Sequence, residues 1–338
     1  MQPAFLVRFP AAGPWRIGPD SGARDRVESL LHSDALYSAI CAAMGQLGLL
    51  EGWLDAIFRR PEGPALRLSS CFPFQDDTHY VVPPRSLWPP APSGKIRWKG
   101  ARFVPLQVVE ALLAGRHPGE DRWRVDGPSR CLVPAERDEG PFRTATRSSA
   151  AVDRLSGNVE AHRTTCLEFS SGAGMWALGL WADESAKEQW DASARAALRL
   201  LADSGFGGRR SLGWGRSLEP EFRDGALPGL IFDSAPGLQA GSDAEPPAAP
   251  ETAYWMLSLF NPGESDTVDC GRGSYSLLTR GGYAAPGGVK KLSRMVAEGS
   301  VIFAGAPTAG AAQDAAPEGA GHPVYRAGFA FALPMPWR

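Results

Sequence analysis

The pattern of apolar and polar positions predicts a strand, a loop and a helix at the N-terminal end. The apolar run from Phe5 to Phe9 suits a short strand, and a Gly/Pro/Arg-rich stretch follows it. In the segment HSDALYSAICAAMGQLG, residues 32–48, apolar side chains recur at helical spacing. Their positions are Leu36, Ile40, Ala43 and Leu47. Ser33 or Asp34 is the expected N-cap, and two glycines follow where the helix should end.

A second strand and helix are predicted in the middle of the chain. The segment GMWALGLWA, residues 174–182, alternates in the way typical of a strand. A helix is then expected to run from an N-cap at Asp191 to a stop at Gly205. Its apolar face is formed by Ala194, Ala197, Leu198 and Leu201. Strand patterns return as YWMLSLF from Tyr254 and as VYRAGFAFAL from Val324.

This order of elements favours an α+β fold of two small sheets with helices on one side of each, which fits tandem ferredoxin-like (RRM-like) domains. The predicted domains are residues 1–164 and 165–338, and the second carries a glycine-rich loop at 205–217. Prolines between positions 83 and 92 exclude regular structure there, so residues 72–133 are interpreted as a projecting insertion. The small, polar, proline-containing segments 235–250 and 304–321 are expected to be flexible loops.

Composition adds limits on location and chemistry. Apolar residues make up 43% of the chain and charged residues 21%, as in ordinary globular proteins. The sequence has no apolar run long enough for a membrane span and no signal-peptide pattern at its start, so a cytoplasmic location without membrane contact is expected. The five cysteines are scattered singly, without metal-ligand spacing. Neither a metal nor a cofactor is therefore expected.

Charge is distributed unevenly. The net charge is -2, yet residues 85–163 contain 14 basic against 9 acidic residues, while the rest of the chain contains 21 against 28. A basic region can attract a polyanion by neutralising phosphates, although basic stretches also occur as ordinary solvated faces. Within this region, Arg143, Arg147 and Arg154 suit phosphate contacts as well as ordinary salt bridges.

The most informative stretch is GFGGRRSLGWGRS, residues 205–217. Its glycines let the backbone approach a ligand closely, and successive N–H groups in such a loop can form an anion-binding nest. Arg209 and Arg210 add planar, bidentate charge toward phosphate, and Ser211 is a further donor. Phe206 and Trp214 are candidates either for stacking on an unpaired base or for anchoring the core. No lysine follows the glycines, so the loop does not fit a nucleotide-hydrolysing P-loop.

The same stretch resembles the glycine-rich loop of the RAMP superfamily of CRISPR RNA-binding proteins. Other segments resemble one family in particular, the 5′-tag-binding fourth subunit of the type III-A Csm complex. These segments are HSDALYSAI from His32, AVDRLSG from Ala151, EGSVIF from Glu298 and HPVYRAGFAF from His322. Together with YWMLSLF, they extend the similarity over nearly the whole chain.

The resemblance implies a non-catalytic subunit with two ferredoxin-like domains that grips the repeat-derived 5′ tag of the guide RNA (crRNA). It also implies docking on the large polymerase-like subunit, contact with an adjacent backbone RAMP subunit and an indirect relation to target RNA in antiviral defence. The family projects a thumb-like hairpin that kinks the guide where tag meets spacer, and we expect it in the insertion at 72–133. No cofactor is implied.

The predicted RNA-binding residues combine the glycine-rich loop, the helix-start motif and the arginine-containing segments. They are Gly205, Phe206, Gly207, Gly208, Arg209, Arg210, Ser211, Gly213, Trp214, Gly215, His32, Ser33, Asp34, Arg143, Arg147, Asp153 and Arg154.

Two other functions remain open at this point. His32 beside the first helix could act as general base on a 2′-hydroxyl, which would make the chain a metal-independent RAMP endoribonuclease that processes guide precursors. Alternatively, the chain contacts only other protein subunits, and the glycine-rich loop is a structural turn.

Overall fold

The computed structural model describes residues 2–19, 23–90, 97–233, 252–284 and 288–336. The predicted N-terminal strand is β1 (Pro3–Pro10), and the predicted first helix is α1 (Ser33–Gln46). Almost every residue of β1 is buried, because the strand lies in the middle of a large antiparallel sheet that is covered on both faces.

The first sheet has the order β11-β1-β10-β3-β4-β5, and a short strand β2 also pairs with β10. In this register Val7 of β1 lies opposite Ala177 of β10 on one side and Phe222 of β11 on the other. The other strands are β2 (Leu66–Leu68), β3 (Phe72–Gln75), β4 (Thr78–Val81), β5 (Val104–Pro105), β10 (Ala173–Trp181) and β11 (Glu221–Ala226). The boundary expected at residue 164 thus falls inside one sheet, because β10 and β11 pair with β1.

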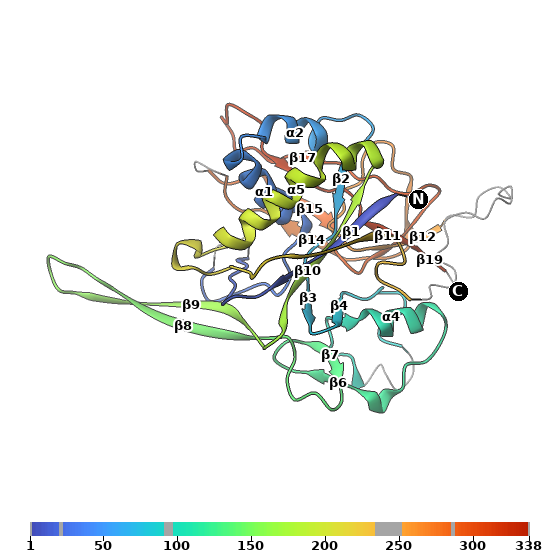
Figure 1. The fold of residues 1–338 in the computed structure, drawn as a ribbon, viewed down its shortest axis with the longest axis horizontal. Helices are drawn as coiled ribbons and strands as arrows, with labels where there is room; N and C mark the ends of the chain where they lie inside the picture. The colour runs from blue at the N-terminus through green and yellow to red at the C-terminus, as the bar shows by residue number, and fades with distance from the viewer. Residues whose placement is uncertain (1, 20–22, 91–96, 234–251, 285–287, 337–338) are drawn as a thin grey trace.

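The helices α1 and α5 (Glu184–Ser204) pack against each other beside this sheet, and α2 (Leu50–Phe58) packs on α1 (Figure 1). The N-cap of α5 is Asp183, whose Oδ1 accepts a hydrogen bond from Ala186 N at 2.7 Å, so the N-cap expected at Asp191 is wrong. The helix is longer because Ala186 and Trp190 extend its buried face toward the N-terminus. It ends at Gly205 as predicted, with φ at 92°.

A second sheet has the order β13-β16-β12-β19. Its strands are β12 (Thr252–Met256), β13 (Val268–Ser274), β16 (Val301–Ala304) and β19 (Ala332–Met335). The described residues from 252 onward form strands but no helix, so this sheet lacks the helices that we expect from the sequence. The two sheets share one core, in which Trp255 lies with Phe5 and Trp176, and its indole N–H donates to Val82 O at 3.1 Å.

The region 72–133 does not project. Its strands β3, β4 and β5 belong to the large sheet, and the other described elements form a compact lobe: α4 (Leu106–Leu113), the 3-10 turn η1 (Glu120–Arg122), β6 (Trp123–Asp126) and β7 (Cys131–Pro134). Buried Phe103, Val109 and Leu132 hold this lobe against the sheet. The apolar content of the segment therefore folds it inward.

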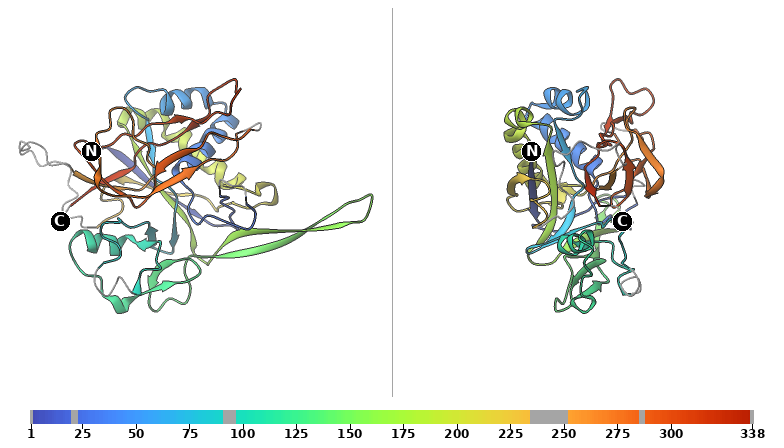
Figure 2. Two further views of the ribbon diagram at one scale, coloured as in Figure 1. Left: turned by 180° about the vertical axis from the view of Figure 1, so that it is seen from behind. Right: turned by 90° about the vertical axis from the view of Figure 1, so that its right-hand side faces the viewer.

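The projecting element is instead a long hairpin of β8 (Phe142–Val152) and β9 (Val159–Phe169). It extends far beyond the body of the molecule in Figure 1 and in the left-hand view of Figure 2. Its outer part consists mainly of Ser, Thr, Ala and Arg side chains that are exposed on both faces. An isolated two-stranded ribbon is only marginally stable in water, so this hairpin is suited to a bound partner.

The remaining strands are two small pairs, β14 (Leu277–Arg280) with β15 (Ser293–Val296) and β17 (Gln313–Asp314) with β18 (Tyr325–Arg326). The segment 304–321 is packed rather than loose, since Thr308 and Ala315 are buried and Asp266 accepts hydrogen bonds from two of its backbone N–H groups. The expected loop at 235–250 lies outside the described residues. Among the described helices, none has the length and apolar character that crossing a membrane requires.

Candidate RNA-binding site

The glycine-rich loop connects α5 to β11 and lies on the segment that follows β1. Gly207 has φ at 72°, and a Cβ there would overlap the carbonyl oxygen of Arg16. Gly215 has φ at 80°, and a Cβ there would overlap the carbonyl oxygen of Phe206. Its N–H donates to Pro14 O at 2.8 Å. The glycines therefore bring two stretches of protein backbone together and fix the shape of the loop.

Most of the amides that could form an anion nest are used inside the protein. Phe206 N donates to Gly215 O, Gly208 N to Arg16 O, and Gly213 N to Arg210 O. The loop thus offers side chains more than backbone to a ligand. Arg210 and Ser211 are exposed in the 3-10 turn η2 (Arg210–Leu212) and face solvent as a binding role requires.

The two aromatic residues of the loop have different positions. Phe206 is 1% exposed, stacks on Trp15 with ring centroids 5.0 Å apart, and meets Phe9 edge-on at 4.9 Å. It is a core anchor, so the stacking role open for Phe206 in the sequence is excluded in this conformation. Trp214 is half-buried.

The loop meets the β8–β9 hairpin at a point we call the loop–hairpin junction, formed by Arg147, Thr164 and Arg209. Thr164 of β9 lies opposite Arg147 of β8, and its hydroxyl accepts a hydrogen bond from Arg209 Nη2 at 3.1 Å. Beneath the junction, the buried Arg16 donates to the carbonyl of Thr165 at 2.9 Å. Burial and the nearby charge of Arg209 lower the pKa of Arg16. Positive charge is thus concentrated at the base of the hairpin.

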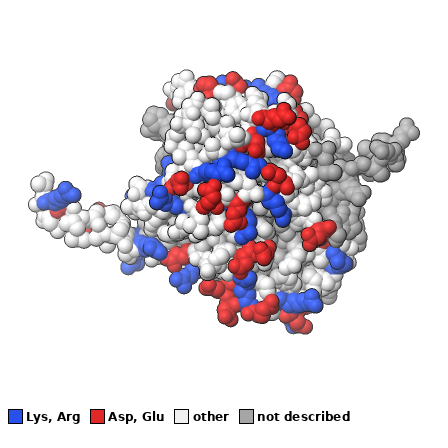
Figure 3. All heavy atoms as spheres, in the orientation of Figure 1, with Lys and Arg blue, Asp and Glu red and all other residues white. Residues whose placement is uncertain are grey.

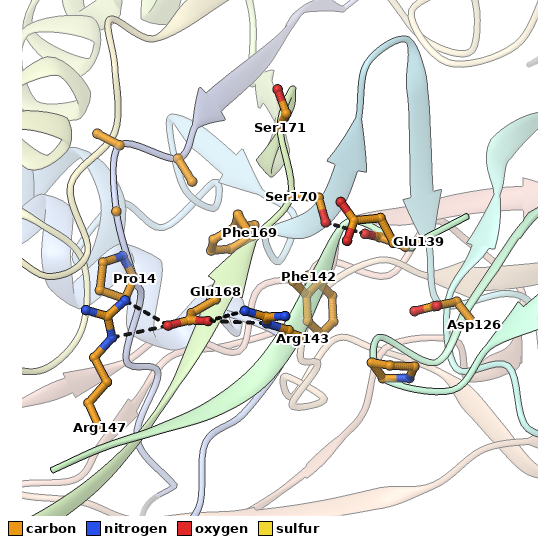
Figure 4. Close-up of a pocket in the computed structure, with 15 residues that line it drawn as sticks. Pro14, Asp126, Glu139, Phe142, Arg143, Arg147, Glu168, Phe169, Ser170 and Ser171 are labelled. Atoms are coloured by element: carbon orange, nitrogen blue, oxygen red, sulfur yellow. Dashed lines mark hydrogen bonds and ion pairs between the residues drawn. The ribbon is translucent and has the colours of Figure 1, made fainter. Parts of the chain in front are cut away.

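An open pocket of about 850 Å³ adjoins this junction (Figure 4). Its walls are residues 11–14, on which the glycine-rich loop rests, the base of the hairpin, and the segment 126–140 with the acidic residues Asp126 and Glu139. Within it, Glu168 forms ion pairs with Arg143 at 3.2 Å and Arg147 at 2.7 Å. Hydrogen bonds from Arg147, and then from Arg143, lower the pKa of Glu168. The two arginine side chains remain 70% and 52% exposed, so they are oriented and still accessible.

The motif VDRLSG forms the tip of the hairpin. Asp153 accepts hydrogen bonds from Leu155 N at 2.8 Å and from the Ser156 hydroxyl at 2.6 Å, and these bonds lower its pKa. Asp153 therefore shapes the turn. Arg154 is exposed, and Leu155, which the sequence analysis misses, is 99% exposed. Figure 3 shows basic side chains at the tip and the base of the hairpin, with a mostly uncharged surface between them.

The motif His32-Ser33-Asp34 is not on the surface, which corrects its predicted RNA contact. His32 and Ser33 are 4% and 1% exposed. His32 Nδ1 lies 2.8 Å from Glu298 Oε1, and the Ser70 hydroxyl donates to the same carboxylate. The Ser33 hydroxyl accepts from Leu259 N at 3.1 Å. This motif joins α1 to the C-terminal part of the chain.

Asp34 completes this sheet–helix joint, as we name the contacts of residues 32–34. Its carboxylate pairs with Arg280 through two contacts of 3.0 and 3.1 Å, and Arg326 Nε lies 3.9 Å away. All three side chains are no more than 10% exposed. Neither Ser33 nor Asp34 is the N-cap; His32 has that position and makes no side-chain cap bond. The side chains of Ser33 and Asp34 bond to these distant partners instead of capping the helix.

Buried titratable groups predict a pH dependence of stability. Burial, reinforced by the charge of Arg8, lowers the pKa of His79 to about 4 from an ordinary value near 6.5. Below pH 6.5, His79 binds a proton in the unfolded chain but stays neutral in the folded chain. The free energy of unfolding therefore falls as the pH decreases toward 4. We expect the free energy of unfolding to fall by about 2 kcal/mol between pH 7 and pH 5. Urea denaturation at both pH values measures it.

Protonation of Glu298 also lowers the stability of the folded chain, but in a lower range of pH. Burial opposes its ionisation, but the attraction of His32 and hydrogen bonds from His32 and Ser70 outweigh burial and lower its pKa. Its stabilising contribution is therefore present at neutral pH and is lost as the pH falls through the pKa of the folded state.

The variant His79→Gln should reduce the loss of stability between pH 7 and pH 5. Equal losses in the variant and the parent chain would refute the assignment to His79.

Comparison with known proteins adds to this geometry. Residues 250–335 match the family described as the CRISPR Csm4 C-terminal domain. A search of curated protein sequences finds no match to the chain. Among solved structures, a chain of the Csm3–Csm4 subcomplex of a type III-A CRISPR-Cas interference complex aligns with a TM-score of 0.64 and 15% identity, covering 98% of this chain and 99% of that one.

A chain of a Csm1–Csm4 cassette in complex with cA4 aligns with a TM-score of 0.57 and 18% identity, covering 99% of both chains. This chain therefore shares its fold with these two chains of type III-A CRISPR structures. In particular, residues 250–335 match the Csm4 C-terminal domain family, and this match confirms the family resemblance that the sequence motifs indicate.

Proposed function

We propose that this chain is the Csm4 subunit of a type III-A CRISPR complex and binds the 5′ tag of the guide RNA. The observation that carries the proposal is the loop–hairpin junction. It brings Arg147 and Arg209 together beside exposed Arg210, at the edge of an open pocket that Arg143 also lines. Guanidinium groups around an open cavity suit the phosphates of a single strand, whose bases can enter the cavity.

The β8–β9 hairpin takes the role of the thumb-like element that kinks the guide at the end of the tag. Its tip presents Arg154 and the fully exposed Leu155, a cation beside an apolar side chain. Such a pair suits insertion between two bases, with the arginine on a neighbouring phosphate. Asp153 supports this role by holding the turn.

The fold supports a ferredoxin-like assignment for the first sheet. Strands β11-β1-β10-β3 lie in the order 4-1-3-2 of a β-α-β-β-α-β unit whose helices are α1 and α5. The second sheet is a counterpart without helices in its described part. We infer contacts with a large subunit and a backbone subunit, because the similar solved chains come from structures described as Csm1–Csm4 and Csm3–Csm4.

The subunit is proposed to bind RNA without cleaving it. A general base must reach the 2′-hydroxyl of a bound ribose. His32 is buried and its Nδ1 pairs with Glu298, on the inside of the sheet–helix joint. This position favours a structural role for His32 over the endoribonuclease hypothesis.

The double variant Arg209→Ala, Arg210→Ala tests RNA binding. In the assembled complex, we expect retention of tagged guide RNA to weaken about tenfold, with a salt dependence reduced by about two ions, because two phosphate contacts are removed. Filter binding over a salt series measures both, and the guide should stay full length.

The matched control is Arg59→Ala, Arg60→Ala, which removes two neighbouring arginines at the end of α2. Arg59 there pairs with Asp55 at 2.8 Å and is 40% exposed. The control should retain the tag as the parent chain does. Unchanged retention in the loop variant would refute tag binding by this loop.

A further inference from the structure

A buried arginine, Arg16, connects three parts of the chain beneath the loop–hairpin junction. Its guanidinium group donates hydrogen bonds to Thr165 O of β9 at 2.9 Å. It also donates to backbone carbonyls of the segment 23–26, those of Ala23, Arg24 and Arg26, at 2.7, 3.3 and 3.1 Å. The carbonyl of Arg16 itself accepts from Gly208 N at 2.8 Å. Residues 23–26 are therefore fixed relative to both the hairpin and the glycine-rich loop.

The segment 23–26 lies along the outer edge of β9. Thr165 faces Thr146 of β8 on one side, and on the other side its N–H donates to Arg24 O at 3.0 Å. Trp15 and Leu167 form an antiparallel bridge on the same outer edge. Arg24 thus lies beside the edge of β9 that faces away from β8, the strand that carries the arginines of the pocket. Basic residues therefore border the hairpin base on both edges.

Arg24 and Arg26 have accessible side chains on this fixed segment. Both residues are exposed, and neither forms an ion pair with any residue in the described part of the chain. The acidic residues nearby in the sequence are Asp25, which is exposed, and Glu28, which lies 3.9 Å from Arg102 Nη1. Since the backbone carbonyls of both arginines bond to Arg16, the two guanidinium groups are presented from a rigid support.

The positive charge around Arg16 lacks a carboxylate partner. Arg16 is 7% exposed, and within the described ranges it forms no ion pair. Burial lowers its pKa most, and the positive charges of Arg209 and Arg24 lower it further, so both of these groups lie near it. Asp25 acts on the pKa in the opposite direction, with a smaller effect. A buried charge without an ion-pair partner is costly, and a polyanion bound above it would reduce that cost.

We propose that Arg24 and Arg26 form a second phosphate-binding rim of the tag site, and that Arg16 is the positioning residue that holds this rim in place. The ligand of the second rim is the sugar-phosphate backbone of the tag, so the inference rests on the proposed function. Planar guanidinium groups bind phosphate oxygens in pairs. Arg16 has Arg24 as a neighbour on one side and Arg209 of the junction as another, which makes the second rim continuous with the tag site.

The chemistry of the segment favours RNA over a protein partner. The centre of a protein–protein interface is rich in aromatic and other apolar side chains and poor in charged ones. Residues 23–26 have the sequence Ala-Arg-Asp-Arg and offer no such centre. Arginine side chains that contact phosphates fix the position of a nucleic acid without reading its bases. The second rim is therefore expected to hold the tag irrespective of its sequence.

The double variant Arg24→Ala, Arg26→Ala in the assembled complex tests the rim. The carbonyls that bond to Arg16 remain in this variant, so the fold should be unaffected. We expect retention of tagged guide RNA to weaken about tenfold, and the logarithmic salt slope to fall by about 1.4, because two phosphate contacts to a single strand are lost. Filter binding over a salt series measures both. The control Arg59→Ala, Arg60→Ala should again behave as the parent chain does.

Asp25→Asn gives a test of opposite sign. This variant removes an exposed negative charge between the two arginines of the rim. Retention of tagged guide RNA should strengthen about twofold at low salt, and the gain should shrink as salt screens the charges. Unchanged or weaker retention at low salt would contradict the presence of RNA phosphates beside Asp25.

Arg16→Lys tests the positioning role. Lysine keeps the charge but lacks the planar fork that reaches several carbonyls at once. We expect this substitution to weaken tag retention in the parent chain and to cause little further loss in the Arg24→Ala, Arg26→Ala chain, where the rim is already absent. Equal losses in the two backgrounds would show that Arg16 only supports the fold and does not position the rim.

The outcomes separate this inference from the proposed function. Unchanged tag retention in Arg24→Ala, Arg26→Ala would overturn the second rim, and so would loss of a protein subunit with RNA retention intact. If Arg209→Ala, Arg210→Ala loses the tag in the same assay, the tag site stands without a second rim. If the loop variant also retains the tag, the proposed function fails as well.

Discussion

Replacing Asp34 with alanine is expected to lower the free energy of unfolding by about 3–5 kcal/mol, the cost of removing one partner from a buried ion pair. The carboxylate pairs with Arg280 at 3.0 Å and lies 3.9 Å from Arg326 Nε. Both arginines are buried, and the variant removes the carboxylate that lies close to both of them. Chemical denaturation of the purified chain measures the loss.

The matched control is Asp55→Ala, which breaks the pair with Arg59 at 2.8 Å on the surface. Asp55 is 65% exposed there, so the loss should be about 1 kcal/mol or less. If the Asp34 variant is insoluble, the isosteric Asp34→Asn keeps one acceptor oxygen toward Arg280 but loses the charge and the second acceptor, so it should still be less stable than the parent chain. An Asp34 variant as stable as the Asp55 variant would contradict the buried joint.

The joint shows where the sequence is informative and where it is not. The segment from His32 is recognisable as a motif, but its contacts lie far along the chain, at Arg280 and Glu298. A helix-start motif with a histidine is equally compatible with RNA binding, catalysis or internal pairing. Only the fold brings the distant arginine and glutamate to it, so the local pattern predicts the helix correctly and misassigns the side chains.

The same reasoning explains the misplaced thumb. Tryptophan and proline in the region 72–133 indicate irregular structure, but Phe103 and Leu132 have enough apolar surface to fold back on the sheet. The segment 142–169 is poor in apolar residues and carries no strong strand signal in its outer part. Its strands exist because they pair with each other over eleven positions, a long-range property that a local pattern does not show.

The glycine-rich loop shows which of its features are local and which depend on the rest of the fold. Its position after a helix that ends at Gly205 is predicted, and Arg210 and Ser211 are exposed as a binding role requires. From the sequence, Phe206 could either stack on an RNA base or pack in the protein core. In the structure it stacks on Trp15, which makes it a core residue. Trp15 lies in the segment after β1, far from the loop in sequence. The sequence of the loop alone therefore could not show which role Phe206 has.

The close backbone approach inside this loop gives a further large effect. Replacing Gly215 with alanine is expected to cost about 3 kcal/mol or more. The residue has φ at 80°, which costs an L-residue about 1–2 kcal/mol, and the new Cβ would also overlap the Phe206 carbonyl oxygen. Relief of that overlap requires the loop to move off Pro14, so retention of tagged RNA should fall together with stability.

Gly213→Ala separates these two causes. Gly213 has φ at 76°, but nothing lies within 4 Å of a Cβ built there. This variant should lose only the backbone cost of about 1–2 kcal/mol and should keep tag retention near that of the parent chain. Urea denaturation and filter binding of both variants give the comparison. Since the two glycines share nearly the same φ, equal losses would mean that the close approach of Gly215 to Phe206 does not fix the shape of the loop.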